Sequence, residues 1–188
     1  MNAERARLFV ALELPGDVRE ALVVWRDGAL AGFGGLRSVS VSSLHVTLCF
    51  LGSVAVTEVD AVWEACGSAI AGRAGSSGPP PLVVGAAVWL PARRPRVLAV
   101  SVGDSSGGLA AEQALLSASL VEGGWYRPET RPFLAHVTVA RVGRGAAVRA
   151  VELPAPPAIE FPGSTVTLFR SWLGPGGSRY EAIRSVAL

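Results

Sequence analysis

A repeated order of segments constrains this chain more than any other feature of its sequence. "RLFVAL" and "RVLAVSV" each read as a strand, a helical pattern follows each, and "HVTLCF" and "HVTVAR" then read as strands. Arg7 and Arg96 are 89 positions apart (96 − 7), and His45 and His136 are 91 apart (136 − 45). Self-similarity at a fixed spacing indicates a repeated structural unit. We therefore expect two equivalent strands around a pseudo-two-fold axis, each presenting a His-x-Thr segment to a shared cleft.

The remaining pattern predicts strands and helices in mixed order. Strands are predicted, from β-forming and apolar residues, at 7–14, 44–51, 82–90, 96–102, 134–141, 164–173 and 178–188. Helices are predicted, from apolar residues at helical spacing, at about 18–31, 57–70 and 109–120. Segments 72–81 and 174–177 predict a loop and a hairpin turn. We expect an α+β fold: one domain over residues 1–188, with two pseudo-symmetric lobes, two largely antiparallel sheets around a central cleft, and helices outside.

Charge and composition give weaker indications. The net charge is only +2, but all 17 basic side chains other than histidine are arginine, and there is no lysine. The base composition of a genome can produce this bias. Arginine also has a planar fork that suits phosphate, and arginines cluster at 93–96 and around the second histidine. The clusters weakly favour an anionic partner.

The chain offers little that indicates a membrane or a metal. Its longest apolar runs, such as 82–90, are shorter than the roughly 18–20 residues of a membrane span. Cys49 and Cys66 have no metal-ligand spacing, so free thiols in a reducing compartment are the expectation. With two histidines, a four-ligand zinc set is possible by count alone. We expect a cytoplasmic monomer with no membrane segment, no metal and no cofactor.

The two His-x-Thr segments predict acid–base chemistry. Alternate side chains of a strand share a face, so His45 lies with Thr47 and His136 with Thr138. Two imidazoles across a cleft can cleave a phosphate ester: one activates the nucleophile and the other protonates the leaving oxygen. The threonine hydroxyls can donate to phosphate oxygens. A lone histidine on a strand is more often structural, so the interpretation rests on the pair.

The chain resembles the 2H phosphoesterase superfamily, and within it the RNA 2′,3′-cyclic phosphodiesterases, which were first named 2′-5′ RNA ligases (LigT-like). The segments that carry the resemblance are "RLFVALELP", "LHVTLCFLG", "RRPRVLAV", "RPFLAHVTVAR" and "SWLGPGGSRYEAI". The resemblance implies hydrolysis of an RNA 2′,3′-cyclic phosphate to a 2′-phosphomonoester. It implies His45 as proton donor, His136 as proton acceptor, and Thr47 and Thr138 as phosphate ligands. The residues alone do not decide which histidine is the acid.

Several further residues are candidates or departures from the family pattern. Many relatives have arginine where Cys49 stands, and strict alternation along the strand would place Cys49 on the same face as His45. Many relatives also have proline where Ala135 stands. Arg141 matches a family residue near the nucleotide, but strict alternation turns it away from His136 unless a bulge or the strand end intervenes. The remaining candidates for substrate binding are Arg131, as a phosphodiester contact, and Phe9 and Phe50, as stacking partners for a base; a loop charge and apolar core are the competing interpretations.

Two other functions remain open at this point. One keeps the fold and changes the reaction to 2′-5′ ligation of RNA or opening of a small cyclic nucleotide. The other is a non-catalytic module that binds RNA ends or nucleotides, and the cysteine at position 49 is its motivation. The expected partner is RNA with a 2′,3′-cyclic phosphate end or a cyclic nucleotide.

Overall fold

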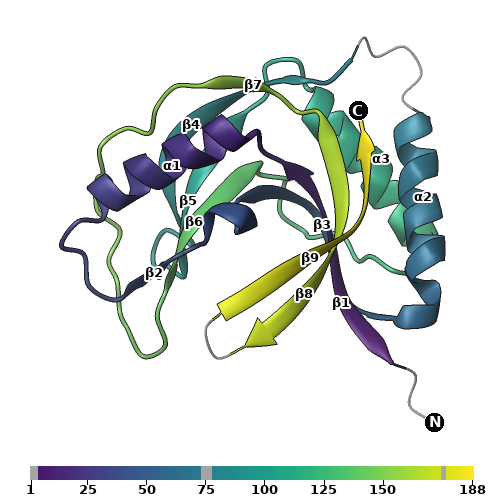
Figure 1. Cartoon of the computed structure of the whole chain (residues 1–188), viewed down its shortest axis with the longest axis horizontal. Coiled ribbons are helices and arrows are strands. Elements are labelled where there is room, and N and C mark those ends of the chain that lie inside the picture. Colours follow the sequence, from purple (N-terminus) through teal and green to yellow (C-terminus); the bar gives the residue numbers. More distant parts are fainter. Residues whose placement is uncertain (1–3, 73–77, 175–176) are drawn as a thin grey trace.

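The computed structural model describes residues 4–72, 78–174 and 177–188. Three α-helices, two short 3-10 helices (Val41–Ser43 and Val56–Glu58) and nine strands lie in this part of the chain (Figure 1). The α-helices are α1 (Gly16–Ala29), α2 (Val59–Ala71) and α3 (Gly108–Glu122). The strands are β1 (Arg5–Glu13), β2 (Leu36–Ser38), β3 (His45–Ala55), β4 (Pro81–Leu90), β5 (Val97–Gly103), β6 (His136–Val142), β7 (Glu160–Pro162), β8 (Thr165–Gly174) and β9 (Gly177–Ala187). The predicted loop at 72–81 and turn at 174–177 lie partly outside the described residues.

The strands form one antiparallel, curled sheet in the order β7-β4-β5-β6-β3-β1-β8-β9, with β2 paired to β6. The two halves of this order, β7-β4-β5-β6 and β3-β1-β8-β9, meet where β3 pairs with β6 through Val46 and Val137. The α+β class is therefore confirmed. The two predicted sheets are joined at this one pair, so they form halves of a single sheet, with the two histidine strands side by side at its centre.

The helix in each repeat reaches across to the other half. Helix α1 follows β1 and contacts β6, whereas α3 follows β5 and contacts β3. Figure 1 shows α2 and α3 lying side by side, apart from α1. Leu109, Leu116 and Leu120 of α3 are fully buried, as are the Val46 and Val137 side chains behind the two histidine strands. The faces of β3 and β6 that carry Val46 and Val137 thus pack into the core, and the opposite faces of these strands are left to form a site.

Two short strands were not predicted from the sequence. Strands β2 and β7 have three residues each, too few for an alternating pattern to stand out. Strand β2 matters for function because it borders β6 and pairs Arg37 with Arg141. No helix in the described part of the chain is long and apolar enough to cross a membrane.

Candidate active site

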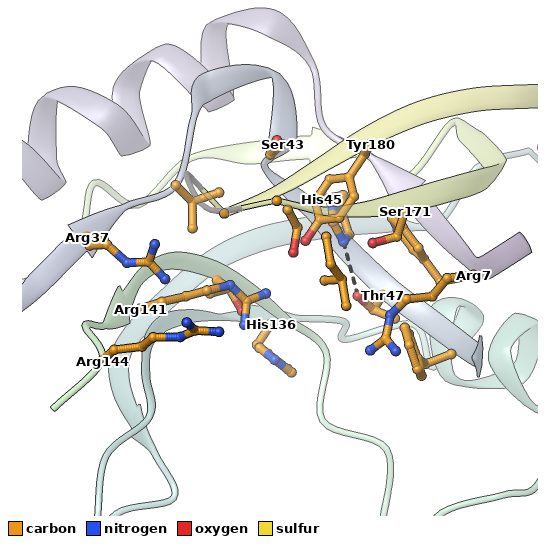
Figure 2. Close-up of a pocket in the computed structure, with 18 residues that line it drawn as sticks. Arg7, Arg37, Ser43, His45, Thr47, His136, Arg141, Arg144, Ser171 and Tyr180 are labelled. Atoms are coloured by element: carbon orange, nitrogen blue, oxygen red, sulfur yellow. Dashed lines mark hydrogen bonds between the residues drawn. The ribbon is translucent and has the colours of Figure 1, made fainter. Parts of the chain in front are cut away.

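The two His-x-Thr segments line one cleft of about 440 Å³. His45 and Thr47 reach it from β3, and His136 and Thr138 reach it from β6 (Figure 2). The intervening valines, Val46 and Val137, point into the core, as alternation requires. Because these valines pair in antiparallel sense, His45 lies toward the Thr138 side and His136 toward the Thr47 side. The expected shared cleft is therefore present, with one imidazole and one hydroxyl from each repeat.

A β-bulge follows Thr47 and changes the face of the next residues. Val10 pairs with Cys49 and Ala11 with Thr47, so Leu48 is an extra residue on β3. Leu48 and Cys49 are both buried, and the strand returns to the cleft at Phe50. The prediction that Cys49 shares a face with His45 was therefore wrong. The thiol lies in the core and does not line the cleft, so the absence of a charge at position 49 does not change the charge of the cleft.

The second histidine strand has the same bulge at the equivalent place. Leu98 pairs with Ala140 and Ala99 with Thr138, which leaves Val139 as the extra residue of β6. Val139 and Ala140 are both fully buried. Arg141 thereby returns to the face of His136 and lines the cleft. The bulge that the sequence analysis required for an inward Arg141 is thus present, and Arg141 occupies the position in its repeat that Phe50 occupies in the other.

His45 stands in a mostly aromatic environment. Its ring stacks on Phe9 at 4.9 Å between centroids and on Phe169 at 6.0 Å, and Tyr180 meets it edge-on at 5.3 Å. Its Nε2 lies 3.1 Å from the Thr47 hydroxyl. Burial lowers the pKa of His45 to about 4; a hydrogen bond to the Ser43 backbone opposes this shift, and the charges of Arg141 and His136 add to it. The free site therefore holds His45 as a neutral imidazole at pH 7.

His136 has a different environment although its strand is equivalent. It is only partly buried, and its Nδ1 lies 2.8 Å from the carbonyl oxygen of Leu134. A carbonyl can only accept, so Nδ1 carries the proton and donates it to this bond. The neutral ring then has an unprotonated Nε2. Leu134 stands two residues before His136, as Ser43 stands two residues before His45, so a backbone contact of the same spacing orients each imidazole.

Arginines line one side of the cleft. Figure 2 shows Arg37, Arg141 and Arg144 together, with Arg7 on the opposite side. Arg37 and Arg141 are direct cross-strand partners, an arrangement that is unfavourable for like charges in the absence of an anion. The ion pairs described in the structure involve other arginines, namely Arg26, Arg170 and Arg184. The cleft therefore carries an excess of positive charge, with no carboxylate among the described residues that line it.

The structure separates the remaining predicted binding residues. Phe50 is 44% exposed at the cleft, with the Arg7 guanidinium 4.6 Å from its ring centroid. Phe9 is 3% exposed and packs under His45, so its ring supports the imidazole and offers little face to a base. Arg131 is exposed on the loop before β6 and is not among the residues that line the cleft.

The sequence analysis missed several cleft residues. Tyr180 was not singled out as a site residue, but it lines the cleft and meets His45 edge-on. Arg7, Arg37 and Arg144 were not singled out as site residues. Arg7 lies on the same strand as Phe9, two residues before it, so the two side chains share a face of β1. Its place two residues from Phe9 was the signal that could have found it.

Among the described residues, the cleft contains no cluster of metal ligands. No group of three or more His, Cys, Asp or Glu side chains in the described parts of the chain is arranged to hold a metal ion. Cys49 and Cys66 are free, buried thiols, and burial raises the pKa of each to about 12. Such thiols stay protonated at neutral pH, so they are poor nucleophiles and poor ligands.

The fold and the paired histidines place the chain among the LigT 2H phosphoesterases. It superposes on the crystal structure of TT0787 of Thermus thermophilus with a TM-score of 0.80, at 28% identity over 97% of each chain. Escherichia coli LigT complexed with 3′-AMP gives a TM-score of 0.75, at 28% identity over 98% of this chain and 99% of that one.

Sequence comparison leads to a particular family. The chain is 32% identical over 188 residues to the RNA 2′,3′-cyclic phosphodiesterase of Escherichia coli (strain K12), with 99% of this chain and 98% of the relative covered. No family model matches the chain. The chain therefore belongs to the RNA 2′,3′-cyclic phosphodiesterase family of LigT-like 2H phosphoesterases.

Proposed function

We propose that the protein hydrolyses the 2′,3′-cyclic phosphate at an RNA end to a 2′-phosphomonoester without a metal ion. The observation that carries the proposal is the pair of His-x-Thr segments, from two equivalent strands, in one arginine-lined cleft. Water attacks phosphorus, the bond from phosphorus to the 3′ oxygen breaks, and a P–OH bond forms. One proton leaves the water and another reaches the departing 3′ oxygen, and this requires one base and one acid.

His136 is suited to the role of base. Its Nδ1–H donates to Leu134, which orients the ring and leaves the Nε2 lone pair for a proton from water. His136 is partly open to solvent, so water can reach it.

His45 is then the acid, and substrate binding must raise its pKa, because the ring is unprotonated in the free site at pH 7. With a pKa of about 4, His45 is unprotonated in the free protein at pH 7. A bound phosphodiester brings a negative charge next to the ring and offsets the field of Arg141, and both effects raise the pKa of His45. Substrate binding therefore moves His45 toward the protonated state that a proton donor needs.

Hydroxyl groups and arginines share the stabilisation of the phosphate. Thr47 and Thr138 lie beside the two imidazoles and can donate to non-bridging oxygens as charge builds in the transition state. Arg141 and its cross-strand neighbour Arg37 supply positive charge on the β6 side. Phe50, backed by Arg7, offers a ring face for the terminal base. In the proposed mechanism, side chains of the protein therefore supply both the proton transfers and the stabilisation of the anionic phosphate.

The test is phosphorus NMR of the product from an RNA oligonucleotide with a 2′,3′-cyclic phosphate end, in excess EDTA. The expected product is the 2′-phosphomonoester, formed by the wild type and lost in His45→Ala and His136→Ala. A 3′-phosphomonoester would overturn the regiochemistry, and turnover that survives both substitutions would overturn the mechanism. Parallel reactions with a small cyclic nucleotide, and with a 5′-hydroxyl RNA as acceptor, measure the two alternative reactions of the same cleft. Tight RNA binding without any turnover would identify a non-catalytic module.

A further inference from the structure

A second hollow, which we call the arginine groove, lies beside the cleft. Its volume is about 690 Å³, and its walls are residues 93–96 on one side and residues 142–148 on the other. Four of the lining residues are arginines, Arg93, Arg94, Arg96 and Arg144, and no lining residue is a carboxylate. The groove is thus positively charged along its length, and its remaining lining is apolar or glycine.

The arginine groove is continuous with the cleft through one side chain. Arg144 lines both hollows, and it stands three residues after Arg141 on the segment that leaves β6. Figure 2 shows Arg141 and Arg144 next to each other on the side of the cleft opposite Arg7. A ligand that leaves the cleft on its arginine-lined side therefore meets Arg144 first and the arginine groove next.

Backbone contacts hold the two walls of the arginine groove in place. The Val142 N–H donates to the Arg96 carbonyl at 2.8 Å and joins the walls directly. The Gly143 N–H donates to the Gly35 carbonyl at 2.8 Å, and a Cβ added at Gly35 would lie 3.1 Å from the Ala146 side chain. The 142–148 wall is therefore packed closely against the segment before β2, and the groove is a preformed surface.

The groove arginines have no counter-charge of their own. None of the four has a carboxylate partner among the described residues, whereas Arg170 and Arg184 pair with Glu4 and Asp60 elsewhere on the surface. Neighbouring unpaired guanidinium groups repel each other, and phosphate suits their forked geometry. A ligand with several regularly spaced negative charges would relieve this repulsion in the groove and the cleft together.

From these observations, and resting on the proposed function, we infer that the arginine groove is a second binding site, which holds the phosphodiesters upstream of the RNA end that reacts in the cleft. The terminal nucleotide occupies the cleft, and the upstream phosphodiesters run over Arg144 into the arginine groove. A mononucleotide ends inside the cleft and cannot use the groove. An acidic protein segment is the competing occupant, and it would leave the affinity for RNA independent of strand length.

The experiment compares affinity for RNA of two lengths. The probes are a fluorescent decamer with a 2′-phosphate end and the mononucleotide 2′-AMP, and dissociation constants are measured over a series of salt concentrations. The variant is R93Q/R94Q/R96Q. Its matched control is R19Q/R127Q/R184Q, which removes the same charge from positions that line neither hollow. The affinity for 2′-AMP serves as the measure of an intact cleft in each protein.

We expect the wild type to bind the decamer at least tenfold more tightly than 2′-AMP, and the groove variant to lose most of that difference. Its slope of log affinity against log salt should be shallower by about 2, for three lost phosphate contacts at about 0.7 each. The control should retain the difference. Equal affinities of the wild type for both probes, or equal losses in variant and control, would overturn the inference. Turnover of the cyclic decamer is scored separately, so a protein that binds strands but hydrolyses nothing refutes the proposed function alone.

Discussion

The two histidine strands have the same backbone and different surroundings. Each carries His-x-Thr, each has an extra residue directly after the threonine, and each orients its imidazole through the backbone two residues upstream. His45 nevertheless lies among three aromatic rings, whereas His136 begins β6, is only partly buried and shares the cleft with several arginines. The repeated backbone therefore sets where the two imidazoles stand, and the side chains that differ between the repeats bury His45 and lower its pKa. The two copies of the unit thus differ in the surroundings of the histidine and not in the backbone that carries it.

The largest effect should come from removing either imidazole. We expect His45→Ala and His136→Ala each to lower kcat/KM by about 10²–10⁴-fold, because each removes one proton transfer. The double variant should lose much less than the product of the two, since the residues act as a unit. Steady-state kinetics on a cyclic-ended oligonucleotide measures all three. A variant within tenfold of the wild type would show that its histidine is structural.

Acid should destabilise the protein through His45. Its folded pKa of about 4 lies below its usual value of 6.5, so the unfolded chain binds more protons between these pH values. The free energy of unfolding should therefore fall by about 3 kcal/mol from this group as the pH drops from 7 to 4. Urea unfolding of His45→Gln at both pH values should show a smaller fall by that amount, and His136→Gln should retain it. Equal pH dependence in His45→Gln and the wild type would contradict the lowered pKa.

The same pKa should respond to the ligand. An NMR titration of His45 in the free protein is expected to give a value of about 4, and added 2′-AMP should raise it because the phosphate favours the imidazolium. By linkage, 2′-AMP should bind more tightly as the pH falls toward that range. A pKa that does not move on saturation with 2′-AMP would assign the proton donor to another group.

Arg141 should matter less than the histidines and more than any loop arginine. Under the proposed mechanism Arg141 contacts the phosphate, so Arg141→Gln should cost about 1.5–3 kcal/mol, or roughly 10–150-fold in kcat/KM. It should also raise the pKa of His45, since the charge of Arg141 contributes to lowering it. Arg131→Gln is the matched control from outside the cleft, with an expected change of less than about twofold. Similar losses in both variants would indicate a general effect of surface charge.

The smallest effect should come from Phe50, the counterpart of Arg141 in the other repeat. Its ring is half-exposed, so Phe50→Ala should weaken binding of the terminal nucleotide by about fivefold, near the lower end for base stacking. Phe50→Tyr should restore it. Phe33→Ala, which removes a 40% exposed ring that does not line the cleft, is the control. No difference between the two alanine variants would remove Phe50 from the site.

The class of fold and the four central side chains could be predicted from the sequence because both depend on local patterns. The face of a residue that follows a bulge could not be predicted, because strict alternation assumes that the strand contains no extra residue. Cys49 was misplaced for this reason, and Arg141 was uncertain for the same one. A signal was present: "LC" and "VA" each put two apolar residues in a row after the threonine. Arg37 reaches the cleft because β2 pairs with the distant strand β6, and Tyr180 reaches it because the β8–β9 hairpin pairs with the distant strand β1 through β8. No local pattern specifies these long-range pairings.

The pair of residues that joins the two halves of the sheet also fixes a distance. His45 and Thr47 flank Val46, and His136 and Thr138 flank Val137, so both His-x-Thr segments lie next to the junction. Neighbouring strands of a sheet lie about 5 Å apart. The separation of the two histidine strands is therefore set by the spacing of one strand pair, and the curvature of the outer strands does not change it.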